Sequence, residues 1–204
     1  MGTPVIDERH RKKLLGFLLV KTAAVRQGIK PGELLRVRHC YADVNSEGLR
    51  VCLYRSDIYD ILGLDYVELK VEAESSLVLF YNPAALDATL AEPHNRRWLA
   101  HLGYPSDGTT AELLAELVRR FSGCAMSHEV GIFIGYPLKD VAGFMHRIAT
   151  TPSHGRAWRI YGNARESLAR MRRYATAEEA AKAALQSADG IDDFIRRLSL
   201  KMAS

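Results

Sequence analysis

The stretch from residue 127 to residue 144 brings a short apolar run, a glycine and a proline close together. The run is rich in β-branched side chains and consists of Val130, Ile132, Phe133 and Ile134. Such a run predicts a short strand that is covered on both faces. Gly135 then permits a sharp turn, and Pro137, with its preset φ, suits the first turn of a helix. Apolar spacing predicts that helix over residues 138–145, with Asp140 in its first turn, where a carboxylate stabilises the positive end.

The same order of strand, turn and helix occurs twice more along the chain. Residues 76–81 show an apolar strand pattern, which Asn82 follows as a helix N-cap. Residues 158–161 show a shorter pattern, which Gly162 follows as a turn and Asn163 as an N-cap. If the three strands are parallel neighbours, their following turns lie at one edge of the sheet, where ligands bind in open α/β proteins.

The chain is predicted to form one compact domain over residues 1–204. Its predicted fold class is α/β or α+β, with a mixed sheet, three strand-turn-helix units and a helical C-terminus. Alternating apolar residues predict two hairpins, one within residues 34–55 and one that joins residues 67–71 to residues 76–81. Helical patterns and caps predict further helices over residues 8–27, 83–90, 93–102 and 109–121, a new helix from Thr176, and a last one over residues 191–198.

Composition narrows the class of protein and its compartment. The 204 residues are 48% hydrophobic and 25% charged, as in ordinary globular proteins, and a net charge of +4 does not indicate nucleic acid. The three cysteines have no CxxC spacing, which argues against a disulfide scaffold and favours a reducing cytoplasm. The apolar run over residues 14–20 is too short for a membrane span. We therefore expect a cytoplasmic protein without a membrane or nucleic-acid partner.

Residues 128–137 read His-Glu-Val-Gly-Ile-Phe-Ile-Gly-Tyr-Pro, and the pairs Asp140-Val141 and Gly143-Phe144 follow. This motif resembles a family of uncharacterised bacterial proteins, domain of unknown function 3793 (DUF3793). Flanking segments agree with the same family, namely the stretch from Leu99 to Pro105, Trp158 with Tyr161 and Gly162, and the pair Lys30-Pro31. The resemblance covers most of the chain and implies a compact bacterial cytoplasmic protein with no established activity.

His128 and Glu129 are the candidate catalytic residues. An imidazole titrates near neutral pH, so the pair is compatible with general acid–base catalysis. The alternative is that both side chains tether the start of the strand by hydrogen bonds. Adjacent residues on a strand point to opposite faces, which favours the tether. Whether the protein is an enzyme stays open on the sequence.

The three predicted turns and the basic segment beside them are the candidate binding site for a small anionic or planar ligand. Free N–H groups at a helix start bind anions, arginines bind phosphates and carboxylates, and aromatic rings near such arginines suit stacking on a planar ligand. The candidate ligand-binding residues are Asn82, Gly135, Tyr136, Trp158, Arg159, Tyr161, Gly162, Asn163 and Arg165. The alternatives are a tight turn at Gly135, a solvated arginine face, and aromatic side chains that belong to the core.

Cys124 and His128 are four residues apart, a spacing that on a helix would place both on one face as metal or haem ligands. His39 is a further candidate ligand. Three scattered cysteines cannot form a closed all-cysteine zinc site, and free cysteines are commonly buried as small apolar residues. We therefore expect no metal site, with Cys124, His128 and His39 as the alternative, and the cofactor stays open.

The function that the sequence supports best is a cytoplasmic small-ligand-binding or accessory protein that recognises an anionic or planar ligand. One alternative is an enzyme that uses His128 and Glu129 as an acid–base pair. Another is a metal- or haem-handling protein. A further alternative is a purely structural partner protein, for example a homodimer formed through the C-terminal helices.

Overall fold

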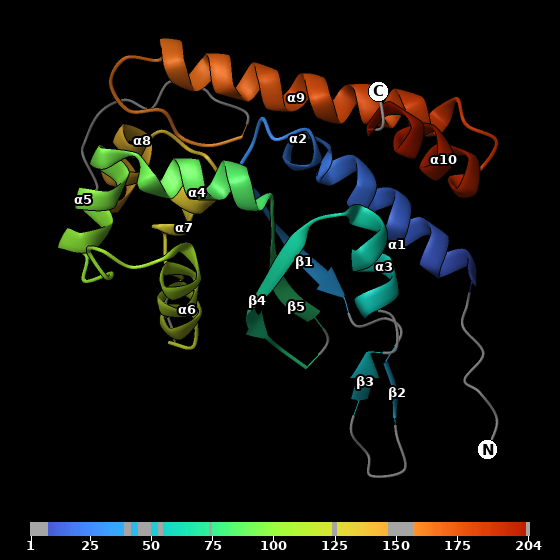
Figure 1. Ribbon diagram of the computed structural model, residues 1–204, viewed down its shortest axis with the longest axis horizontal. Helices are drawn as coiled ribbons and strands as arrows, with labels where there is room; N and C mark the ends of the chain where they lie inside the picture. The colour runs from blue at the N-terminus through green and yellow to red at the C-terminus, as the bar shows by residue number, and fades with distance from the viewer. Residues whose placement is uncertain are drawn as a thin grey trace.

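The computed structural model describes residues 8–38, 42–44, 50–52, 55–73, 75–123, 126–146 and 157–202. Its strands are β1 (Gly32–Arg38), β2 (Ala42–Val44), β3 (Arg50–Cys52), β4 (Asp65–Val71) and β5 (Ser75–Tyr81). Its helices, shown in Figure 1, are α1 (Glu8–Lys21), α2 (Ala23–Arg26), α3 (Arg55–Leu62), α4 (Pro83–Ala91), α5 (Pro93–His101), α6 (Thr110–Phe121), α7 (Val130–Phe133), α8 (Leu138–Met145), α9 (Arg165–Gln186) and α10 (Ile191–Met202).

The main sheet has three strands in the order β1-β5-β4, and both pairings are antiparallel. The hairpin predicted between residues 67–71 and 76–81 is confirmed as β4–β5. Within the other predicted hairpin, only β2 and β3 pair with each other, in a separate two-stranded sheet, because β1 pairs with β5 instead. The fold is therefore α+β, and the parallel arrangement of three strands was wrong.

Side chains alternate along β5 and divide the core into two parts. Leu77 and Leu79 belong to a core that α4, α6 and α7 cover, which we call the α7 side. Val78 and Phe80 belong to a second core that α1, α3 and α10 cover, which we call the α1 side. Figure 1 shows these two groups of helices on either side of the sheet, with α9 running past both.

Several predicted helix boundaries are confirmed. Asn82 caps α4 by accepting a hydrogen bond from the Ala85 backbone N–H at 3.0 Å. The helix predicted over residues 109–121 is α6, and Thr109 and Glu112 form a capping box at its start. The last predicted helix begins at Ile191 as α10, directly after Gly190, whose φ of 88° breaks the chain from α9.

The strand predicted over residues 130–134 is wrong, because this run forms the helical turn α7. Its backbone hydrogen bonds are local, for example from Ile134 N to Val130 O at 3.1 Å. A short apolar run is compatible with either a buried strand or a buried helical turn. Gly131 decides the packing, since a Cβ there would lie 2.8 Å from Val141 Cγ2 on α8. The close approach of α7 and α8 requires glycine at this position.

Two further predictions in the C-terminal half need correction. The strand predicted over residues 158–161 is reduced to a single bridge residue, Ile160. The helix break predicted at Thr176 is wrong, because α9 continues through it from Arg165 to Gln186. Thr176 is exposed on this alanine-rich helix, where a threonine costs little helix stability. Among the described residues, no helix is long and apolar enough to cross a membrane.

Candidate ligand-binding site

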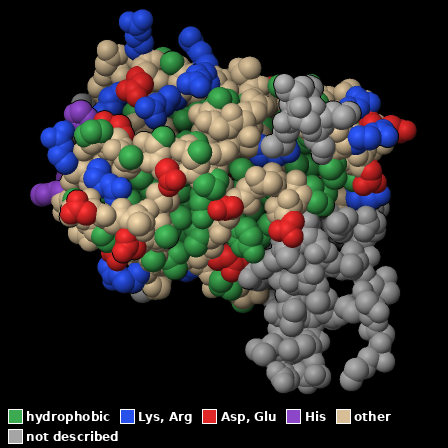
Figure 2. Space-filling view, in the orientation of Figure 1, with side chains coloured by type: hydrophobic (Ala, Val, Ile, Leu, Met, Phe, Trp, Pro, Cys, Tyr) green, Lys and Arg blue, Asp and Glu red, His purple; other side chains and the backbone are tan. Residues whose placement is uncertain are grey.

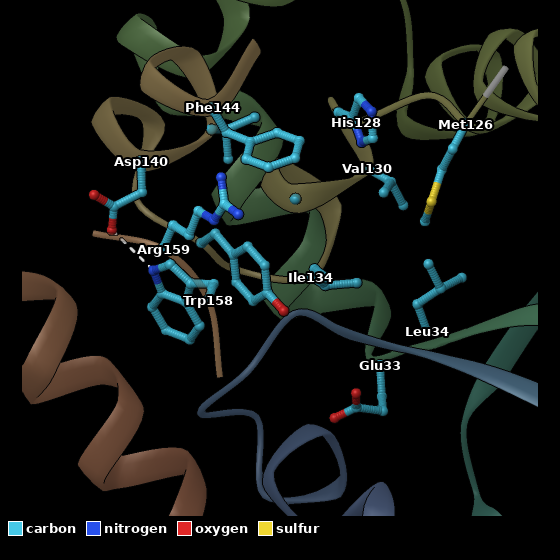
Figure 3. Close-up of a pocket in the computed structure, with 13 residues that line it drawn as sticks. Glu33, Leu34, Met126, His128, Val130, Ile134, Asp140, Phe144, Trp158 and Arg159 are labelled. Atoms are coloured by element: carbon cyan, nitrogen blue, oxygen red, sulfur yellow. Dashed lines mark hydrogen bonds between the residues drawn. The ribbon is translucent and has the colours of Figure 1, made fainter. Parts of the chain in front are cut away.

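A cavity of about 410 Å³ opens on the α7 side, between β1, α7, α8 and the segment around Trp158. Figure 3 shows the side chains that surround it. Its walls and rim are formed by Glu33, Leu34, Met126, His128, Val130, Gly131, Ile134, Tyr136, Asp140, Val141, Phe144, Trp158 and Arg159. This volume lies within the range of about 300–1,000 Å³ that is typical of small-molecule sites.

The floor of the cavity is apolar and formed by elements of the core. Val130, Ile134 and Val141 are buried and come from α7, the turn after it, and α8. Leu34 extends from β1 and packs on the same core. A molecule in the cavity would therefore remove apolar surface from water, which favours binding.

One wall is aromatic. The Tyr136 and Trp158 rings stack with centroids 4.2 Å apart and an angle of 21° between their planes. The Tyr174 ring of α9 lies behind Trp158, with centroids 6.4 Å apart. This arrangement presents a flat, rigid aromatic surface, which suits a planar ligand.

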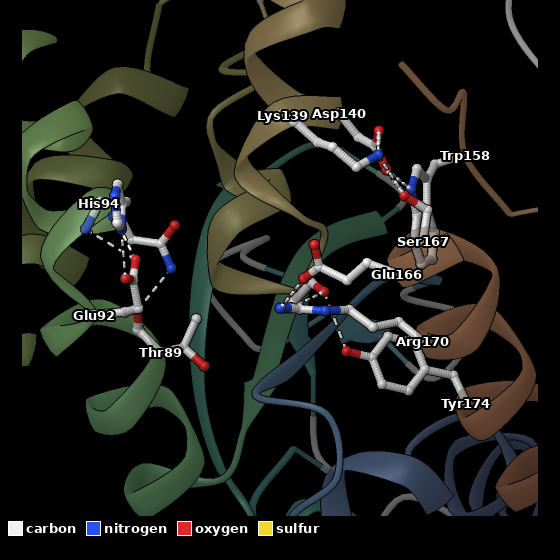
Figure 4. Close-up of polar contacts among 12 residues, drawn as sticks. Thr89, Glu92, His94, Lys139, Asp140, Trp158, Glu166, Ser167, Arg170 and Tyr174 are labelled. Atoms are coloured by element: carbon white, nitrogen blue, oxygen red, sulfur yellow. Dashed lines mark hydrogen bonds and ion pairs between the residues drawn. The ribbon is translucent and has the colours of Figure 1, made fainter. Parts of the chain in front are cut away.

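Asp140 holds this wall in place. Its carboxylate is buried and accepts hydrogen bonds from Trp158 Nε1 at 2.8 Å and from the Tyr161 backbone N–H at 2.8 Å. It also accepts a hydrogen bond from Ser167 Oγ at 2.6 Å and pairs with Lys139 Nζ at 2.7 Å (Figure 4). The Asp140 cluster, defined by these five residues, therefore joins α8, α9 and the segment that carries Trp158.

Opposing effects act on the Asp140 carboxyl. Burial alone would raise its pKa, because a charge is poorly solvated in the interior. The hydrogen bonds from Lys139, Ser167, the Tyr161 backbone and Trp158 outweigh burial, and the pKa of Asp140 lies below its ordinary value. The carboxylate is therefore ionised at neutral pH and acts as an acceptor for all four donors.

The rim of the cavity carries its accessible cation. Arg159 is exposed, and its guanidinium lies over the Phe144 ring, 5.9 Å from the centroid. The His128 and Phe144 rings pack in an edge-to-face arrangement, with ring centroids 4.8 Å apart. In the part of the chain that the structure describes, no carboxylate pairs with Arg159. The rim therefore combines one positive charge with two rings.

Comparison with known proteins shows which family the chain belongs to. A family model described as "Protein of unknown function (DUF3793)" matches residues 18–195, which is most of the chain. The chain belongs to the DUF3793 family. No curated protein and no solved structure matches it. The resemblance seen in the sequence is thus confirmed. The description of the family names no function.

The two candidate catalytic residues of this DUF3793 chain do not share the cavity. His128 lines the cavity, whereas Glu129 is buried and is not part of the cavity wall. Glu129 Oε1 accepts a hydrogen bond from Tyr104 Oη at 3.2 Å and lies 3.5 Å from Arg120 Nη1. These contacts anchor the start of α7 to α6, and they are the contacts expected of a tether.

Gly135 and Asn82 are not among the residues that line the cavity. Gly135 has a φ of 82°, and a Cβ there would lie 2.6 Å from Pro31 Cδ and 2.7 Å from Tyr174 Oη. Its carbonyl oxygen accepts hydrogen bonds from Tyr174 Oη and Arg170 Nη1, both at 3.1 Å. The side chain of Asn82 is used by its cap. The two positions build the fold around the site and do not face a ligand in it.

The predicted residues after Trp158 divide between the core and a different surface. Tyr161 is buried against Gly143 of α8. Gly162 is exposed, and Asn163 accepts a hydrogen bond from the Arg165 backbone N–H at 2.9 Å. Asn163 and Arg165 border a separate depression with Lys139, and neither lines the cavity. Figure 2 shows Lys and Arg side chains along the edge over the first part of α9.

Of the nine predicted ligand-binding residues, the structure therefore brings Tyr136, Trp158 and Arg159 together in one cavity. The metal alternative is not assembled by what the structure describes: Cys124 and His39 lie outside the described residues. Within those residues, no group of three or more His, Cys, Asp or Glu side chains is arranged to hold a metal ion.

Sequence reasoning missed Glu33, Met126 and Phe144 as cavity residues and assigned Asp140 only to the helix end. Asp140 and Phe144 belong to the sequence motif of residues 128–144, and both lie on α8. Glu33 gave no such signal, because its approach to the cavity depends on how β1 joins the sheet.

Proposed function

We propose that this DUF3793 protein is a cytoplasmic binding or accessory protein that holds a small planar, anionic ligand in the cavity beside Trp158. The observation that carries the proposal is the combination of the Tyr136–Trp158 stack with the exposed guanidinium of Arg159. The rings favour a flat molecule, and the guanidinium favours a carboxylate or phosphate attached to it.

The rigidity of the aromatic wall supports the proposal. Four hydrogen-bond donors meet the Asp140 carboxylate, and one of them is the Trp158 indole. A ring that is already fixed loses little conformational freedom when a ligand binds, so more of the contact energy appears as affinity. The Asp140 cluster therefore favours a preorganised site over one that forms only when the ligand binds.

Charge within the cavity supports an anion. Lys139 compensates Asp140, and Lys30 compensates Glu33, at 2.7 Å in each case. Arg159 is left as the uncompensated charge among the described side chains of the cavity. An acidic ligand would complete this balance, whereas a cationic ligand would meet repulsion at the rim.

The test is a thermal-shift screen of the full chain against planar aromatic carboxylates and phosphates, followed by calorimetric titration of the molecules that raise the melting temperature. We expect Arg159→Ala to weaken binding about 10-fold or more, because it removes a charge-assisted contact. Arg165→Ala is the matched control, since Arg165 is an exposed arginine outside the cavity.

Both arginine variants should fold with nearly the melting temperature of the wild type, because exposed side chains contribute little to stability. Equal loss of binding in both variants would indicate diffuse attraction to the basic segment and would contradict a site in the cavity. A screen in which no planar acid binds would contradict the proposal outright.

A further inference from the structure

The end of the cavity opposite its cationic rim contains an acidic acceptor. Glu33 and Leu34 come from β1 and lie away from His128 and Phe144 (Figure 3). Glu33 Oε2 binds Lys30 Nζ at 2.7 Å. Within the described ranges, the second oxygen of Glu33, Oε1, has no hydrogen-bond partner. One lone-pair face of this carboxylate is thus available to a molecule in the cavity.

Lys30 fixes Glu33 without entering the cavity. The Lys30 side chain is 8% exposed, and its Nζ lies over the Tyr174 ring, 5.3 Å from the centroid. The Glu33 side chain, which forms the ion pair with Lys30, is 21% exposed. A carboxylate that is oriented from behind by a buried ammonium keeps its direction, and it meets the ligand as a fixed acceptor.

Tyr136 adds a donor near this acceptor. Burial first, and then the charges of Glu33 and Tyr174, raise the pKa of Tyr136 to about 12. The phenol is therefore neutral at physiological pH and retains its hydrogen. The hydroxyl has no hydrogen-bond partner among the residues that the structure describes, although the ring is half-buried. Its proton is thus available to a ligand acceptor.

We infer that Glu33 and Tyr136 select a planar nitrogen heterocycle whose edge carries an N–H donor beside a ring acceptor, with an acidic group at the opposite end. Glu33 would accept the N–H, the Tyr136 hydroxyl would donate to the ring acceptor, and Arg159 would bind the acid. Aminopurines and pterins have such an edge. This inference rests on the proposed function and deepens it by naming the class of ligand.

The physical reason is the cost of leaving a half-buried carboxylate oxygen without a partner. A flat acid without an N–H donor would displace water from Glu33 and offer nothing in return. Sites built around such a polar group discriminate strongly against analogues that lack the matching donor. The aromatic wall and Arg159 would bind both kinds of acid, so Glu33 would set the preference between them.

The experiment compares matched ligands by calorimetric titration of the full chain. The first pair is adenosine 5′-monophosphate and purine riboside 5′-monophosphate, which differ by the exocyclic amino group. Pterin-6-carboxylate tests a carboxylate in place of the phosphate. We expect the wild type to prefer the amino compound by about 10-fold or more, because a hydrogen bond to a charged group is lost in the other.

Two variants assign this preference to its residues. Glu33→Gln removes the charge, and Tyr136→Phe removes only the hydroxyl and keeps the stacked ring. In both, we expect the amino compound to lose affinity and the preference to fall to within about 3-fold. Glu72→Gln is the control, because Glu72 pairs with Arg36 at the end of the sheet, outside the cavity. Circular dichroism and melting temperature establish that each variant is folded.

The outcomes separate this inference from the function on which it rests. If the wild type binds both compounds equally, or both variants keep the preference, Glu33 and Tyr136 do not select the ligand. Binding of planar acids that still depends on Arg159 would then leave the proposed function intact. If planar acids bind but neither amino heterocycle does, the inferred ligand class is wrong. If Glu33→Gln fails to fold, Tyr136→Phe decides the question alone.

Discussion

The two sides of the central sheet are packed by different means. The α1 side is an apolar core in which long helices contribute Leu15, Leu18, Leu19 and Phe194. The α7 side contains the short helices α7 and α8, glycines at close approaches, and the buried carboxylates Glu129 and Asp140. Buried carboxylates are costly unless their partners are in place, so their position is informative.

This difference indicates which side of the molecule contains features that stability alone does not require. Apolar packing alone would stabilise the α7 side as well as it stabilises the α1 side. The buried polar groups instead fix directions, since Asp140 orients Trp158 and Glu129 anchors the turn that carries His128. Both oriented side chains line the cavity. The comparison therefore supports the α7 side as the functional side of the molecule.

The largest effect that would break this comparison is expected from Asp140→Ala. Its removal leaves the Trp158 indole and the Tyr161 N–H without their acceptor and Lys139 without its counter-charge. We expect the free energy of unfolding to fall by about 3 kcal/mol, since one partner of a buried pair is lost. Urea denaturation measures it.

The α1 side offers a control for this variant. Asp192 pairs with Lys12 at 3.6 Å, and both side chains are largely exposed, at 84% and 46%. Asp192→Ala should change the free energy of unfolding by less than about 1 kcal/mol, as is usual for exposed pairs. If the two aspartate variants are equally stable, the Asp140 cluster does not organise the α7 side.

A smaller effect is expected from alanine at two helical glycines. On α8, a Cβ at Gly143 would lie 2.8 Å from both Cβ and Cδ1 of Tyr161. On α1, a Cβ at Gly16 would lie 3.3 Å from the flexible end of Leu185. We expect Gly143→Ala to destabilise the protein by about 1–3 kcal/mol through overpacking, and Gly16→Ala to be neutral or stabilising by up to about 1 kcal/mol.

Thermal unfolding measures the stability of both variants, and near-ultraviolet circular dichroism detects whether the Tyr136–Trp158 stack is disturbed. Only Gly143→Ala should change that spectrum, because Tyr161 is joined through its backbone to Asp140 and so to Trp158. A stable Gly143→Ala protein with an unchanged spectrum would show that α8 adapts more easily than its close packing indicates.

Both sides of the sheet were predicted only in part from the sequence. On the α1 side, periodicity located α10, whereas the single helix predicted over residues 8–27 is divided in the structure into α1 (Glu8–Lys21) and α2 (Ala23–Arg26). On the α7 side, the run Val130 to Ile134 was assigned to a strand because its composition is β-rich. The composition of this run does not reveal that Gly131 allows Val141 to pack at close range, because that contact depends on how α8 packs against α7.

The site could be predicted in part. The sequence identified Tyr136, Trp158 and Arg159, which lie in or directly follow recognisable motifs, and the structure places them in one cavity. It favoured a tether for His128 and Glu129, but it could not name Tyr104 and Arg120 as the partners of the Glu129 carboxylate, because both come from other parts of the chain. It also could not place Glu33, since strand pairing between β1 and β5 sets its position.

The smallest predicted effect is on the pH dependence of stability, and it compares one aspartate from each side of the sheet, Asp140 and Asp193. The pKa of Asp140 lies below its ordinary value of 3.8, because its hydrogen bonds outweigh the effect of burial. The pKa of Asp193 on the α1 side is lowered to about 2 by hydrogen bonds from Arg196, from the Asp189 backbone and from Arg197. Both therefore stabilise the folded state above the unfolded pKa, and this contribution is lost as the pH falls through the folded value.

We expect Asp140→Asn and Asp193→Asn each to lose less stability than the wild type when the pH is lowered below about 4. Salt distinguishes them, because the cationic partners of Asp193 are 73% and 49% exposed and Asp193 itself 12%, whereas Lys139 is 32% exposed and Asp140 1%. Raising NaCl from about 0.1 M to about 1 M should remove most of the Asp193 difference and little of the Asp140 difference. Urea denaturation as a function of pH measures both. Equal salt sensitivity would mean that water reaches the Asp140 carboxylate, and the aromatic wall would then not be held by a buried charge.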